Sequence, residues 1–294
     1  MTRISHQWDD ADVCEMDILD HSFLNDLVPF TKTFSYDGEH QLNNLLDSEF
    51  SERTAYFLLR SGKKSIESII KSVETYSISS FDITEGLILF KLSFRTHAAA
   101  VHEINLLIIE KLLPMGLDKA IQGFPRPRIT GKESTRGKEP DYSWCPTRTP
   151  RSSAHVKTRM PTVALEVAVT EDDKKLNSDV RYWLSPNDGN ANLCLTLRIN
   201  PINNEIRMES WARKDNNDNK QRARIDRTQV IYVHSTQEGR PIVTGDLPFR
   251  IPFESLMLRP IDAQTAAEQD IIFSQADLEE AARSIWIAEE EEEE

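Results

Sequence analysis

The stretch Pro161-Thr162-Val163-Ala164-Leu165-Glu166-Val167-Ala168-Val169 decides which fold the sequence predicts. It is an almost continuous apolar run with the length of a strand, which is typical of a central strand buried on both faces of a sheet. Side chains alternate between the faces of a strand, so Glu166 shares its face with Ala164 and Ala168. An unpaired buried carboxylate is costly, so Glu166 needs a cation, hydrogen-bond donors or solvent. Two interpretations remain open: a functional site, or a half-exposed strand on which Glu166 meets water or an arginine.

A second acid, Asp141, lies one predicted strand earlier. It follows Pro140 at the start of a short predicted strand over residues 141–145. An acid after proline is common in turns, so this signal alone is weak. However, consecutive strands can bring Asp141 beside Glu166, and two converging carboxylates repel unless a divalent cation lies between them. The two acids therefore predict a cation site.

A predicted helix over residues 171–184 supplies a basic residue after the two acids. Lys175 lies four residues before Asp179, a spacing that places both on one side of the helix. The alternative is an exposed ion pair, which contributes little to stability. Only the two upstream acids favour a functional interpretation of Lys175.

These residues together resemble the PD-(D/E)XK nuclease superfamily. The similarity covers about residues 85–212 and is carried by Lys138-Glu139-Pro140-Asp141, by Leu165-Glu166-Val167-Ala168, and by Lys175-Leu176 with Asp179 and Tyr182-Trp183-Leu184. It is similar to a group of fungal members and, more distantly, to bacterial restriction endonucleases. The resemblance implies an α/β (α+β) fold with a restriction-endonuclease-like core, in which helices flank a central mixed sheet and the active site lies at one sheet edge.

The resemblance also implies a metal site. Asp141 and Glu166 would bind Mg²⁺ or Mn²⁺, with the Val167 carbonyl as a further ligand and Glu103 as an accessory acid. The implied activity is metal-dependent phosphodiester hydrolysis of nucleic acid, with DNA favoured. The metal would acidify a water molecule and neutralise charge on the phosphate.

The catalytic lysine departs from the usual pattern. The superfamily's lysine commonly stands two residues after the Glu, where this chain has Ala168. Lys175 on the next helix is the natural substitute, with Lys174 as second choice, and would position the water and stabilise charge. A catalytically inactive nuclease-like fold that acts as an interaction or regulatory module is therefore the alternative. A third interpretation is an unrelated α/β protein in which the two acids are incidental.

Charge is unevenly distributed along the chain. The net charge is −13, but residues 1–50 carry −9, residues 262–294 carry −11, and the segment between them carries +7. Bases concentrate around the two acids, where they would contact phosphates without reading sequence. The candidate nucleic-acid-binding residues are Arg126, Arg128, Lys132, Arg136, Lys138, Arg148 and Arg151. The alternatives are solvated loops, or a docking surface for the chain's own acidic ends or for a protein partner.

The predicted organisation has three parts. Residues 1–45 form an acidic, largely disordered segment, residues 46–262 the nuclease-like domain, and residues 263–294 a helix, expected over residues 263–287, followed by an acidic tail of six glutamates that should be solvated and mobile. Within the domain, apolar spacing predicts helices over residues 51–60 and 64–75. Glycine-rich phosphate loops, a serine nucleophile elbow and zinc-ligand spacings are absent from the sequence, which argues against those classes of site.

The sequence predicts no membrane association. No apolar run reaches the roughly 20 residues that a membrane helix needs, and the first residues lack the apolar region of a signal peptide. The sequence therefore predicts an intracellular protein, nuclear or cytoplasmic, with reduced cysteines.

Overall fold

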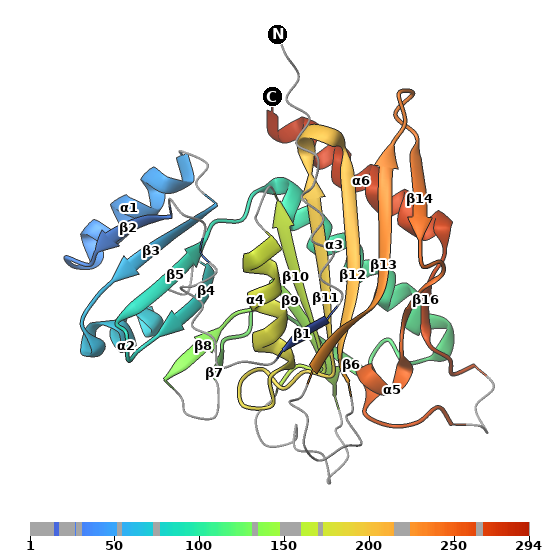
Figure 1. Ribbon diagram of the computed structural model, residues 1–294, viewed down its shortest axis with the longest axis horizontal. Helices are drawn as coiled ribbons and strands as arrows, with labels where there is room; N and C mark the ends of the chain where they lie inside the picture. The colour runs from blue at the N-terminus through green and yellow to red at the C-terminus, as the bar shows by residue number, and fades with distance from the viewer. Residues whose placement is uncertain are drawn as a thin grey trace.

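An eight-stranded mixed sheet forms the larger layer of the computed structural model (Figure 1). The structure describes residues 15–17, 27, 31–51, 55–72, 77–130, 135–147, 160–169, 173–214, 224–262 and 267–293. The strand order is β1 (Glu15–Asp17), β13 (Arg224–Ser235), β12 (Glu205–Lys214), β11 (Leu193–Asn200), β10 (Val163–Val169), β9 (Tyr142–Pro146) and β6 (Ile121–Pro125), with β14 (Pro241–Gly245) paired to β13. Among the described strands of this sheet, only β10 and β11 pair in parallel, and α4 (Asp173–Leu184) connects them, as a parallel pair requires.

The strand over Val163–Val169 has the central position that its sequence predicts. It lies between β9 and β11. One face packs against α3 (Arg95–Leu112), on which α6 (Gln275–Glu293) packs in turn, and Val163, Leu165 and Val167 join the main hydrophobic core there. The other face lies against α4, where Ala164 packs in a second cluster with residues of that helix. Glu166 therefore points to the α4 side, into the buried interior.

A six-stranded mixed sheet forms the second layer, on the α4 side of the larger sheet (Figure 1). Its order is β2 (Lys32–Ser35), β3 (Tyr56–Arg60), β5 (Leu87–Lys91), β4 (Ser77–Asp82), β8 (Arg136–Lys138) and β7 (Ile129–Thr130). Helices α1 (Glu39–Ser51) and α2 (Lys63–Ser72) cover one of its faces. The chain leaves this sheet after β5 to begin α3, and leaves it again after β8 to begin β9. The segments that follow β5 and β8 both run into the candidate site.

The remaining described elements are a short strand pair with its helix, near the C-terminus, and two 3₁₀ turns. Strands β15 (Phe249–Ile251) and β16 (Ile271–Phe273) pair with each other, and the short helix α5 (Phe253–Met257) follows β15. Two 3₁₀ turns, η2 (Leu113–Met115) and η4 (Pro201–Asn203), follow α3 and β11. None of the described helices has both the length and the apolar character that a membrane crossing needs.

The structure differs from the predicted elements in three places. Tyr56–Arg60, within a predicted helix, is strand β3, because its residues 56–59 are buried on both faces and a short apolar run fits a strand as well as a helix. Residues 31–45, within the segment predicted to be largely disordered, contain β2 and the first part of α1, whose Leu42 is buried in the core. The glutamates up to residue 293 continue α6, and Glu291 pairs with Arg95 at 2.9 Å. Residues 263–266, at the start of the predicted last helix, lie outside the described residues.

Candidate functional site

Buried ionisable side chains gather where the two sheets and α4 meet. We call this set the ion cluster, and each of its members is only 1% to 5% exposed. Its members are Lys91, His97, Lys138, Asp141, Glu166, Lys175 and Asp179. Charged groups are rarely buried unless they are paired, so this concentration marks a specialised place in the fold.

Asp141 is the centre of one half of the cluster. Its Oδ2 atom accepts hydrogen bonds from Lys91 Nζ and from the Val167 backbone N–H, each at 2.7 Å, and lies 3.1 Å from His97 Nε2. Lys91 Nζ also donates to the Val167 carbonyl oxygen at 2.7 Å. The carboxylate and the carbonyl predicted to bind a metal thus hold one ammonium group between them.

The protonation states in this half follow from burial and charge. Burial alone would raise the pKa of Asp141, but the neighbouring His97 and Lys91 and their polar contacts hold it well below its usual range. Burial lowers the pKa of His97, although Asp141 opposes this. The imidazole is therefore neutral at neutral pH, and Lys91 is the cation that stabilises the Asp141 carboxylate.

Glu166 belongs to the other half, on the α4 side. Its Oε1 atom accepts a hydrogen bond from Trp183 Nε1 at 2.5 Å and lies 3.7 Å from Lys138 Nζ. Burial raises the pKa of Glu166 to about 8, with Asp179 adding to the shift and Lys138 opposing it. Glu166 is therefore mostly protonated near neutral pH, in contrast to Asp141.

Asp179 holds both lysines of this half. Lys138 Nζ and Lys175 Nζ each lie 2.5 Å from Asp179 Oδ1. Burial would raise the pKa of Asp179, but these two ammonium groups lower it. The predicted pair of Lys175 and Asp179 on α4 is present, but it is buried, and Lys175 contacts Asp179 rather than Glu166.

Tyr56 of β3 connects the two halves. The ammonium groups of Lys91 and Lys175 lie 5.7 and 5.5 Å from the centroid of its ring. An ammonium within about 6 Å of an aromatic face is attracted by the ring quadrupole. The ring of Tyr56 therefore helps to hold two like charges in one buried space.

The two predicted acids lie close to each other along neighbouring strands. Asp141 directly precedes β9, whose first residue Tyr142 pairs with Leu165 of β10, and Glu166 is the next residue of β10. Glu103 of α3 is half-buried and makes no hydrogen bond or ion pair with another described residue.

Some oxygen atoms of the ion cluster suit a divalent metal ion and others do not. Across the described residues, no group of three or more His, Cys, Asp and Glu side chains is placed to hold one. The Asp141 carboxylate and the Val167 carbonyl are nevertheless the hard oxygen ligands that Mg²⁺ prefers, and they already converge on a cation. The fit to a divalent ion is therefore good for these two groups, whereas Glu166 is turned towards Trp183 and Lys138.

Two members of the cluster were missed by the sequence reasoning. Lys91 interrupts the apolar strand Leu87–Lys91, and it breaks the pattern of a buried strand in the same way as Glu166 does. That signal could have identified it. His97 follows β5 by a few residues, in the first turn of α3, and only the three-dimensional structure brings it to Asp141.

The predicted nucleic-acid-binding residues make internal contacts where they are described. Lys138 is buried in the ion cluster, so its ammonium group cannot reach a phosphate in this conformation. Arg128 pairs with Glu139 at 2.7 Å and contacts the Ile70 carbonyl. Arg126 donates to Ser93 at 2.5 Å, and Arg136 lies 3.9 Å from Asp188. Lys132, Arg148 and Arg151 lie outside the described residues.

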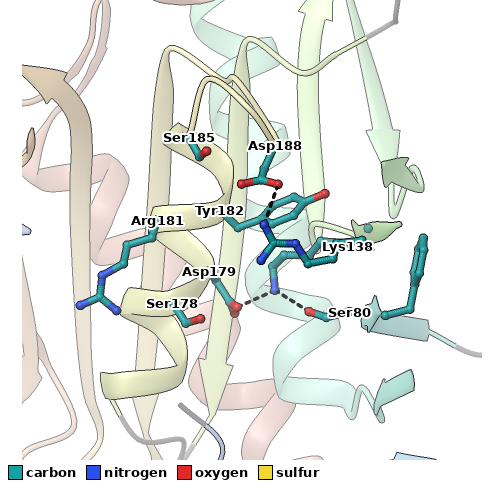
Figure 2. Close-up of a pocket in the computed structure, with 11 residues that line it drawn as sticks. Ser80, Lys138, Ser178, Asp179, Arg181, Tyr182, Ser185 and Asp188 are labelled. Carbon is teal, nitrogen blue, oxygen red and sulfur yellow. Dashed lines mark hydrogen bonds and ion pairs between the residues drawn. The ribbon is translucent and has the colours of Figure 1, made fainter. Parts of the chain in front are cut away.

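A small pocket lies beside the ion cluster, between β4, β8 and α4 (Figure 2). Figure 2 shows Lys138 reaching from β8 towards Asp179 of α4 and Ser80 of β4. The pocket has a volume of about 40 Å³, room for on the order of one water molecule. It is lined by Ser80, Phe81, Arg136, Gly137, Lys138, Ser178, Asp179, Arg181, Tyr182, Ser185 and Asp188.

Comparison with known proteins adds no family assignment. No protein-family model matches the chain, and no curated protein is significantly similar to it.

Proposed function

We propose that the chain is a metal-dependent hydrolase of phosphodiester bonds in nucleic acid, with DNA as the favoured substrate, on a restriction-endonuclease-like fold. The order of the functional residues supports the proposal. Asp141 directly precedes β9, Glu166 lies in the middle of the neighbouring strand β10, and Lys175 lies on the helix that follows. This is the order in which the resemblance to the PD-(D/E)XK superfamily expects them.

One observation carries the proposal. Asp141 Oδ2 and the Val167 carbonyl oxygen, from two adjacent strands, lie 2.7 Å from a single cationic atom, Lys91 Nζ. A carboxylate and a carbonyl that converge in this way form a cation site made of oxygen atoms. These groups would hold Mg²⁺ or Mn²⁺, and Glu166 on the same pair of strands is the third candidate ligand.

The neighbouring residues fit the demands of this chemistry. A bound divalent ion supplies an acidified water and neutralises charge on the phosphate. Lys175 is the ammonium group that would stabilise negative charge developing on a phosphate oxygen, once it is released from Asp179.

A second candidate is favoured by a specific observation. Every carboxylate of the ion cluster already lies within 4 Å of an ammonium group, and all the side chains are buried. Together with Ala168 at the usual lysine position, this arrangement favours a catalytically inactive nuclease-like fold that acts as an interaction or regulatory module. The two candidates differ in whether metal binding and cleavage occur.

Cleavage assays test the proposal. Full-length protein, Asp141→Asn and Glu166→Gln are incubated with plasmid DNA, single-stranded DNA and RNA, with Mg²⁺, with Mn²⁺ or with a chelator. We expect the unaltered protein to cleave in a metal-dependent way and both variants to lose this activity. Glu238→Gln, in an exposed turn, is the control and should keep the activity. Circular dichroism verifies that each variant is folded. Cleavage unaffected by either substitution, or none with any metal, would contradict the proposal.

A further inference from the structure

Lys91 lies where a metal ion would bind. Its side chain is 6% exposed, and its ammonium group lies 2.7 Å from both Asp141 Oδ2 and the Val167 carbonyl oxygen. Both contacts are made to oxygen atoms that would otherwise coordinate a divalent ion. The Lys91 ammonium group and a metal ion therefore cannot use these two oxygens at the same time.

The charges of the ion cluster lead to the same conclusion. Even if the three carboxyl groups of Asp141, Glu166 and Asp179 were all ionised, the three ammonium groups beside them would already balance their charge. The ammonium groups belong to Lys91, Lys138 and Lys175. A divalent ion added to this set would leave the buried space with a net positive charge, which is strongly unfavourable away from water. Metal can therefore enter only if an ammonium group leaves.

Lys91 is the ammonium group placed to leave. Lys138 and Lys175 both contact Asp179, whereas Lys91 alone of the three contacts Asp141. Lys91 also comes from a different layer, since it is the last residue of β5 in the six-stranded sheet, while Asp141 and Val167 belong to the eight-stranded sheet (Figure 1). Rotation of its flexible side chain would withdraw the ammonium group from both oxygen ligands.

We infer that Lys91 is a tethered cation that competes with a divalent metal for Asp141 and the Val167 carbonyl, so that the six-stranded sheet holds the site in a latent state. This inference rests on the proposed function, because it concerns the regulation of the same site. In the latent state Lys91 supplies the positive charge that Asp141 needs, and the buried site is stable without metal. In the competent state Lys91 is withdrawn and the metal supplies that charge.

The test measures metal affinity after removal of the competitor. Lys91→Met keeps the length of the side chain and removes its charge, and Mn²⁺ binding to the full-length protein is measured by calorimetry. The apparent affinity of the unaltered protein is reduced by the fraction of molecules in the competent state. A competent fraction below about a tenth therefore means that Lys91→Met binds Mn²⁺ at least about tenfold more tightly. Lys64→Met, at an exposed lysine of α2, is the matched control and leaves the affinity unchanged. A folded Lys91→Met variant with no gain in affinity would overturn the inference.

Two further measurements cover the case in which Lys91→Met does not fold without metal. The double variant Lys91→Met, Asp141→Asn removes both charges and is expected to fold but not to bind Mn²⁺. In the unaltered protein, acylation followed by mass spectrometry reports the exposure of the Lys91 amine. Lys91 is expected to be protected without metal and to react at Mn²⁺ concentrations that raise the melting temperature. A raised melting temperature with Lys91 still protected contradicts the competition.

The outcomes also separate this inference from the proposed function. If Lys91→Met binds Mn²⁺ more tightly but cleaves no nucleic acid, the competition is correct and the hydrolase proposal fails. If the unaltered protein cleaves DNA with Mn²⁺ and Lys91→Met changes neither affinity nor rate, the hydrolase proposal stands and the competition fails.

Discussion

Trp183 Nε1 of α4 donates a hydrogen bond to Glu166 Oε1 of β10 over 2.5 Å, in a place where both side chains are buried. The acid that the sequence assigns to a metal is thus held by the helix that packs on its strand. This contact links the position of α4 to the protonation and orientation of Glu166. It also gives a direct way to perturb Glu166 without changing the acid itself.

Trp183→Phe tests the strength of this contact. The substitution removes the only N–H of the side chain and leaves Glu166 with one donor fewer, so we expect a loss of about 1–3 kcal/mol in the free energy of unfolding, measured in urea. Trp286→Phe is a useful control, because the buried Trp286 Nε1 has no hydrogen-bond partner among the described residues. If the two variants lose equal stability, the contact with Glu166 contributes nothing beyond ring packing.

The raised pKa of Glu166 predicts a specific pH dependence. Burial raises this pKa to about 8, whereas an exposed glutamate titrates near pH 4.3. The folded state therefore binds an extra proton between these two values, and its stability falls as the pH rises through that window, by on the order of 1 kcal/mol per pH unit. Glu166→Gln cannot ionise, so its stability curve should lack this slope. Urea unfolding of both proteins between pH 5 and 9, at constant ionic strength, measures the difference, and parallel curves would show that Glu166 titrates normally.

The buried pair of Lys138 and Asp179 is predicted to be strongly coupled. Lys138→Met leaves Asp179 with one ammonium partner fewer, and Asp179→Asn leaves Lys138 without its closest carboxylate, so each change should cost about 3–5 kcal/mol. The double variant should cost less than the sum of the two, since it leaves fewer uncompensated charges.

Lys214→Met provides the surface comparison for this pair. Its ion pair with Asp226 is 3.0 Å long, but the lysine side chain is 54% exposed. The expected cost is much smaller than for the buried pair, because water screens an exposed ion pair. Additive effects of Lys138→Met and Asp179→Asn would mean that the buried pair behaves like this exposed one.

Gly137 of β8 is predicted to tolerate no side chain. A Cβ atom at this position would overlap the ring of Phe81 and lie 2.9 Å from the Ile129 carbonyl oxygen. Gly137→Ala should therefore lower the free energy of unfolding by about 1–3 kcal/mol. Gly62→Ala is the control, since no atom lies within 4 Å of its Cβ position, and it should change stability by less than about 0.5 kcal/mol. Equal melting temperatures for the two variants would contradict the close packing of β8 on β4.

The central strand and its acid could be predicted from the sequence because both depend on local patterns. The apolar run around Glu166 gave the position of β10, and the strand alternation gave the face on which Glu166 lies. The helix that carries Lys175 and Asp179 followed from apolar periodicity. In each case the signal is contained in a few consecutive residues.

The partners of these residues could not be predicted in the same way. Lys91 precedes Asp141 by fifty residues and reaches it only because the ends of β5 and β9, in two different sheets, meet at the ion cluster. Lysine is usually a surface residue, so the sequence does not show that Lys138 is buried. Only the packing of β8 against α4 buries it. The strand β3 was assigned to a helix, because a short apolar run has no period that separates the two.

The chain leaves the six-stranded sheet twice, after β5 and after β8, so the two sheets do not correspond to two contiguous segments of the sequence. Strands β7 and β8 belong to that sheet, yet they follow α3 and β6 of the other layer in the sequence. No single cut therefore releases either layer as a contiguous polypeptide. A fragment ending before α3 lacks two strands of its own sheet, and the complementary fragment carries those two strands without their neighbours. The layers are interleaved in the covalent chain, and expressing half of it should yield neither a smaller domain nor a simpler site.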